Sequence, residues 1–221
     1  MNWYAFFLLS GLLLYFLFVF LQARKYRMEM YKSVILIVMD FAFVLLGAKL
    51  LAMAQEHSLD VLKTGFSSYG GLIGIIVSTL LFIKLTSVPA RQILIVSLMP
   101  VPLVYGVGKI GCFIAGCCKG IAINGTTVPV QLLEAVSFLL VFMLFYYFYK
   151  TRQVTVNYIY SEVLACAIIK GMLYYLRQES VGNPFGSHQW LCLFCVIISV
   201  FLLVYGKNKN RPNNKTPFVS R

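Results

Sequence analysis

Long apolar runs separated by short polar segments are the main pattern along this chain. Seven runs reach or approach the roughly 20 residues that a helix needs to cross the hydrocarbon core of a bilayer. They cover residues 3–21, 33–55, 69–85, 92–107, 130–149, 158–176 and 189–205. Each run is uniformly apolar, whereas the strands of a membrane barrel alternate in polarity. The pattern therefore predicts an all-α polytopic membrane protein with about seven transmembrane helices, of which the third and fourth are short or interrupted by proline.

The composition agrees with this pattern. Of the 221 residues, 60% are hydrophobic and only 12% are charged, and the mean hydropathy is +0.84. Soluble domains have about 25% charged residues, and a soluble core of this size could not bury so much apolar surface. These values exclude a cytosolic enzyme, a secreted disulfide scaffold and a disordered protein.

The basic residues predict an orientation. Four lie after the first run, two after the third, two after the fifth and five in the tail, so 13 of the 19 Lys and Arg residues fall on one side of the membrane. Cytoplasmic loops carry an excess of Lys and Arg. We therefore expect the N-terminus outside and the C-terminus in the cytoplasm. This topology also accounts for the net charge of +12, so we expect no nucleic-acid partner.

Two parts of the chain differ in composition. Residues 1–206 contain all seven runs and form the predicted membrane domain. Residues 207–221 are polar, basic and rich in Asn and Pro. Such a segment cannot bury enough apolar surface to fold, so it is predicted to be a disordered cytoplasmic tail.

Unusual residues collect on the predicted outer side of the membrane. Polar or ionisable residues at membrane depth are costly and commonly mark a functional site. Five separate segments contribute them: Tyr69, Gly70, Gly71 and Gly74; Lys109, Gly111, Cys112, Gly116, Cys117, Cys118 and Gly120; Gln131 and Glu134; Lys170, Tyr174 and Arg177; His188 and Gln189. Structural polar residues scattered through the helices would not favour one side so strongly. We expect a shared cavity toward the outer leaflet.

Positive charge defines the ligand class that this cavity would suit. Lys109, Lys170 and Arg177 are its cations, and glycines allow backbone to approach a ligand closely. At this depth the available anion is a phospholipid headgroup. The sequence therefore predicts a lipid-phosphate site, with membrane lipid as a partner.

Three segments resemble the prolipoprotein diacylglyceryl transferase family. They are residues 69–74 (YGGLIG), 108–120 (GKIGCFIAGCCKG) and 129–134 (PVQLLE), and the segment from Lys170 to Arg177 together with Gln189 resembles the family's last two spans. The resemblance implies seven spans, an outside N-terminus and a multi-pass protein of the bacterial cytoplasmic membrane. It also implies an enzyme that transfers the diacylglyceryl group of phosphatidylglycerol to the lipobox cysteine thiol of a prolipoprotein, next to its signal peptide.

The resemblance also implies roles for individual residues. Lys109, Arg177 and Lys170 would hold the leaving phosphate, and Gln131 and Glu134 would orient a cation or headgroup. Family members carry His at the position of Tyr69 and Arg at the positions of Lys109 and Lys170, so the base would be His188 or Tyr69. The segment glycines would contact substrate; they are Gly70, Gly71, Gly111, Gly116 and Gly120. No cofactor or metal is expected.

The cysteines leave other functions open. Cys112, Cys117 and Cys118 lie within seven residues on the predicted outer side, where disulfides persist. One alternative is therefore a membrane thiol oxidoreductase that uses these three cysteines. The spacing Cys-x4-Cys-Cys matches no common zinc pattern. A second alternative is a non-catalytic lipid-binding relative of the transferases.

Overall fold

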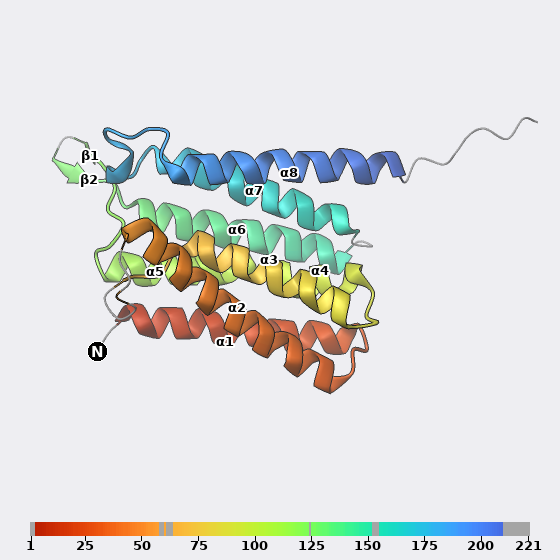
Figure 1. Ribbon diagram of the computed structural model, residues 1–221. Coiled ribbons are helices and arrows are strands. Elements are labelled where there is room, and N and C mark those ends of the chain that lie inside the picture. The colour runs from red at the N-terminus through yellow and green to blue at the C-terminus, as the bar shows by residue number, and fades with distance from the viewer. Residues whose placement is uncertain (1–2, 58–59, 61–63, 124, 152–154, 210–221) are drawn as a thin grey trace, which may run out of the picture.

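The computed structural model describes residues 3–57, 60, 64–123, 125–151 and 155–209. Most of the described chain is helical, which confirms the all-α prediction (Figure 1). The helices are α1 (Trp3–Lys25), α2 (Met30–Glu56), α3 (Ser68–Leu85), α4 (Ala90–Leu98), α5 (Val101–Ile114), α6 (Val130–Thr151), α7 (Val156–Tyr174), the short 3-10 helix η1 (Gln178–Ser180) and α8 (Ser187–Lys209). A two-stranded antiparallel hairpin, β1 (Ala122–Ile123) with β2 (Thr126–Thr127), precedes α6.

Seven helical segments in the described chain are long and apolar enough to cross a membrane, as the sequence predicts. Helices α4 and α5 together make the fourth of them, Ala90–Ile114. The interruption lies at Met99 and Pro100, and Pro102 stands in the first turn of α5. Proline has no backbone N–H and suits the start of a helix better than its interior. The proline pair therefore divides one span into two helices.

The C-terminal boundary differs slightly from the prediction. Helix α8 continues to Lys209, three residues beyond the predicted end of the membrane domain. The rest of the predicted disordered tail, residues 210–221, lies outside the described residues.

The bundle brings distant segments to one end. Figure 1 shows the N-terminus, the hairpin, the C-terminal end of α5 and the start of α8 together at the left. The last turns of α1, α3 and α6 contain Arg24, Lys25, Lys84 and Lys150, and these helix ends lie at the opposite end of the bundle. The separation matches the two sides deduced from the basic residues, and the orientation in the membrane stays a prediction.

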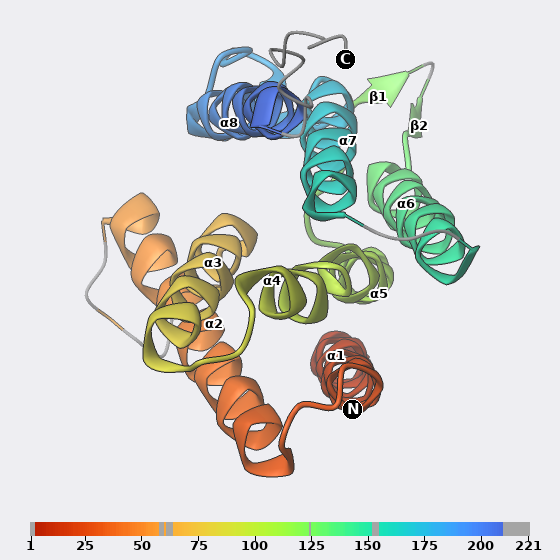
Figure 2. The same ribbon diagram turned by 90° about the vertical axis from the view of Figure 1, so that its right-hand side faces the viewer.

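Helix pairs form the core of the bundle. Figure 2 shows α5 between α1 and α6, with α2 beside α3 and α7 beside α8. The α2 and α3 backbones approach closely because glycines face each other: a Cβ added at Gly70 would overlap the carbonyl oxygen of Gly47. A Cβ at Gly74 would overlap that of Phe43 in the same way. Small residues allow this close approach of helices in membranes.

A buried carboxylate joins the first helices. Asp40 of α2 accepts hydrogen bonds from Tyr15 of α1 (2.6 Å) and Ser78 of α3 (2.7 Å), and Tyr15 also donates to the Ser97 carbonyl of α4 (3.2 Å). Partners of this kind make a buried carboxylate tolerable. Asp40 therefore has a structural environment of its own, distinct from that of the residues described next.

Candidate functional site

Glu134 is the centre of the candidate site. It lies one turn inside α6 and is fully buried. Arg177 donates from Nη2 to Oε1 at 2.6 Å and to Oε2 at 2.8 Å, and from Nε to Oε1 at 3.1 Å. Lys109 of α5 places Nζ 2.8 Å from Oε2. A carboxylate buried in this way is stable only because both oxygens have charged partners.

Arg177 is held by backbone on both sides. It follows α7, and its backbone forms an isolated bridge with Gly120, while Gln178 N–H donates to the Lys119 carbonyl at 3.0 Å. Burial alone lowers the pKa of Arg177, but the adjacent Glu134 carboxylate outweighs this and raises that pKa above its ordinary value. The guanidinium is therefore a permanent charge. Glu179, 3.9 Å away and half exposed, is a weaker partner than Glu134.

Tyr105 connects the ion pair to a third cation. Its hydroxyl donates to Glu134 Oε2 at 3.0 Å. The Lys170 ammonium lies 4.4 Å from the centroid of its ring and 4.0 Å from that of Tyr69, and Lys109 lies 5.3 Å from the Tyr105 ring. Cations are attracted to the faces of aromatic rings. The three predicted cations thus gather around Glu134 and Tyr105, and Glu134 balances one of their charges.

The two predicted bases lie next to each other. The rings of Tyr69 and His188 are stacked with centroids 5.0 Å apart. The Tyr69 hydroxyl lies 3.4 Å from both the His188 carbonyl oxygen and the Cys192 sulfur. His188 Nε2 lies 3.9 Å from Glu179. His188 therefore keeps one ring nitrogen, the buried Nδ1, without a hydrogen-bond partner among the described residues.

Gln131 attaches the loop after α5, which carries Cys117 and Cys118, to α6. Its side-chain amide donates to the Cys117 carbonyl at 2.6 Å, so within the described residues it holds protein backbone rather than pointing freely to a ligand. The hydrogen bond with Cys112 and the charges of Lys109 and Arg177 lower the pKa of the Cys118 thiol. The predicted thiol residues are thus in the same electrostatic environment as the ion pair.

The glycines have packing or turn roles. A Cβ added at Gly70 or Gly71 would point toward α2. A Cβ at Gly111 would lie 2.8 Å from Cβ of Phe7 in α1. Gly116 has φ +69° and forms the turn after α5, while a Cβ at Gly120 would overlap the Val128 carbonyl. Helix and loop packing therefore explains these glycines without a ligand, and their contact with substrate stays a prediction.

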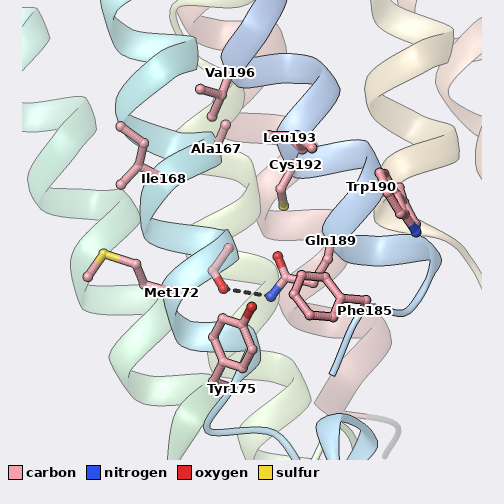
Figure 3. A pocket seen from close by; sticks show the side chains of 11 residues that line it. Ala167, Ile168, Met172, Tyr175, Phe185, Gln189, Trp190, Cys192, Leu193 and Val196 are labelled. Atoms are coloured by element: carbon pink, nitrogen blue, oxygen red, sulfur yellow. Dashed lines mark hydrogen bonds between the residues drawn. The ribbon is translucent and has the colours of Figure 1, made fainter. Parts of the chain in front are cut away.

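An apolar groove of about 540 Å³ lies between α7 and α8 beside this site (Figure 3). Its walls include Met172, Tyr175 and Leu193. Gln189 donates to the Gly171 carbonyl at 3.0 Å across the groove, and Cys192 links it to Tyr69. The groove is therefore lined mainly by apolar side chains.

Fold and site together define a multi-pass helical membrane protein with a buried cationic centre at one end of its bundle. The family model of prolipoprotein diacylglyceryl transferases matches residues 1–205. The chain belongs to this family.

Two curated relatives share the family name. The phosphatidylglycerol–prolipoprotein diacylglyceryl transferase of Clostridium tetani is 29% identical over 186 residues, which cover 72% of this chain and 74% of the relative. The enzyme of the same name from Campylobacter hominis is 29% identical over 153 residues, covering 65% of this chain and 54% of that relative. These matches support diacylglyceryl transfer at the level of the family.

Proposed function

We propose that this protein transfers the diacylglyceryl group of phosphatidylglycerol to the lipobox cysteine of a prolipoprotein, at the end of the bundle that faces the outer leaflet. The arrangement of Lys109, Arg177 and Lys170 around one buried carboxylate is the observation that supports this most directly. Glu134 balances one of the three positive charges, so positive charge remains to bind a phosphate. The family membership supports the same reaction.

The reaction needs a thiolate and a stabilised leaving group. The thiolate, which is the nucleophilic form, attacks the carbon of the diacylglyceryl group that carries the phosphate. A bond forms between the sulfur and that carbon. The bond between that carbon and the phosphate oxygen breaks, and glycerol phosphate leaves with the electron pair. His188 takes the thiol proton, as histidine commonly does near neutral pH. The cations stabilise charge that develops on the leaving phosphate.

The groove between α7 and α8 suits the lipid tails. Burial of each methylene contributes about 0.8 kcal/mol relative to water. Within a bilayer the lipid tail is already out of water, so the groove chiefly fixes the position of the lipid. A lipid whose tail lies along Leu193 and Met172 would have its headgroup near Gln189, in the first turn of α8.

A transfer assay tests the proposal. Protein in phosphatidylglycerol vesicles should move labelled diacylglycerol to a lipobox peptide, and the gene should restore growth to cells that lack their own transferase.

Arg177→Ala should reduce transfer by about 100-fold or more, as expected for loss of one preorganised electrostatic contact. Lys84→Ala is the matched control, because Lys84 is exposed at the opposite end of the bundle. Absence of label on the peptide, where a related enzyme works, contradicts the catalytic proposal and favours a lipid-binding protein.

The identity of the base gives a separate prediction. His188→Ala should lower transfer by about 100-fold or more, the usual contribution of a general base. Tyr69→Phe removes only two long contacts of the hydroxyl and should change the rate by a few fold. Single-turnover rates at saturating lipid provide the measurement. A larger loss in Tyr69→Phe than in His188→Ala would remove His188 from this role.

A further inference from the structure

The structure brings three thiols together at the end of α5. The Sγ atoms of Cys112, Cys117 and Cys118 all lie within 4.8 Å of one another. None of the three is in a disulfide, and all are partly exposed. Nothing in the proposed transfer reaction uses them. Their sequence spacing matches no common zinc pattern, so only the folded loop reveals this proximity.

The loop conformation produces the cluster. After α5, Gly116 (φ +69°) and Cys118 (φ +54°) adopt left-handed backbone, and the Cys117 N–H donates to the Cys112 carbonyl at 3.1 Å. These two turns direct the chain back toward Cys112. A non-glycine residue in this conformation is uncommon and is often found at a functional position.

The sulfur positions fit a metal ion. A zinc ion bonds thiolate at about 2.3 Å, which requires sulfur atoms roughly 3.8 Å apart in a tetrahedral site. Small side-chain rotations bring atoms within 4.8 Å to that separation. We propose that Cys112, Cys117 and Cys118 bind one thiophilic metal ion, of the class of zinc or monovalent copper, through three thiolates.

The surrounding charges and contacts suit such an ion. Three thiolates around a divalent ion carry one net negative charge, and Lys109 and Arg177 are neighbouring cations that attract it. The loop is joined to the transfer site, because Gln131 holds the Cys117 carbonyl and Gly120 pairs with Arg177. A bound ion would therefore fix the loop segment that positions Arg177. The ion is assigned this structural role and no step of the transfer reaction.

Cadmium titration tests the site without any activity measurement. Full-length protein in detergent, kept reduced with a phosphine that does not compete for metal, should bind one equivalent of Cd²⁺ with a thiolate-to-metal charge-transfer band in the ultraviolet. Serine replacement of any one of the three cysteines should weaken binding by at least about tenfold, because each removes one ligand. Cys118→His, which keeps a ligand, should bind more tightly than Cys118→Ser. Circular dichroism confirms that each variant is folded.

Two of the three other cysteines provide the control. Cys166 of α7 and Cys195 of α8 lie outside the cluster, and their double serine variant should bind Cd²⁺ like the original protein. The proposal is overturned if the reduced protein shows no band at one equivalent, or if the triple serine variant keeps it. A disulfide within the cluster whose reduced form binds no metal also overturns it. None of these outcomes depends on whether the protein transfers lipid.

Discussion

Replacing Glu134 with glutamine should strongly reduce transfer and destabilise the folded protein. The carboxylate is fully buried and forms ion pairs with both Lys109 and Arg177, whose side chains are themselves buried. The amide cannot balance those charges, and breaking a buried ion pair by removing one partner costs about 3–5 kcal/mol. Transfer should fall by at least about 100-fold, because the cations lose the positions on which stabilisation of the leaving phosphate depends. Thermal unfolding in detergent and the transfer assay measure the two effects.

Glu162 supplies a matched control for this change. It is also a buried glutamate, on α7, but neither carboxylate oxygen has a hydrogen-bond partner among the described residues. Glu162→Gln removes no ion pair and should leave stability unchanged or raise it. Equal losses in the two variants would show that burial alone, and not the pairing with Lys109 and Arg177, makes Glu134 important.

Gly70→Val should prevent assembly of the α2–α3 pair. The new Cβ would overlap the backbone carbonyl of Gly47 and contact Leu51, and backbone atoms cannot move aside without separating the helices. Overpacking typically costs about 1–3 kcal/mol, and a backbone overlap with no flexible neighbour belongs at or above the upper end. We expect little monodisperse protein after extraction, as measured by size-exclusion chromatography.

The neighbouring glycine provides the comparison. A Cβ at Gly71 would lie 3.6 Å from Val44 Cγ1, which is ordinary van der Waals contact. Gly71→Ala should therefore be tolerated, with a gain of up to about 1 kcal/mol from helix propensity. A variant Gly70→Val that folds as well as Gly71→Ala would contradict the close helix contact.

Local sequence patterns were enough to predict most of the fold. Run length alone predicted seven spans, and the prolines at 100 and 102 marked the span that is broken into α4 and α5. The partners of Glu134 were harder to predict. Its three polar partners come from α5 and from the segment after α7, and Tyr105 was missed although it lies one turn before Lys109 on the same helix. The four-residue spacing of Tyr105 and Lys109 puts both on one face of the helix, and this was the signal that could have revealed Tyr105.

The sequence by itself determined that the chain is a seven-helix membrane protein whose unusual residues collect at one end, because apolar run length and the positions of charges are properties of contiguous segments. Only the tertiary structure decided that Glu134 lies between Lys109 and Arg177, that Gly70 meets Gly47, and that the Cys112, Cys117 and Cys118 sulfurs form one cluster. Those distances depend on how helices pack and how the loop after α5 turns back. Neither can be derived from the apolar pattern of a single segment.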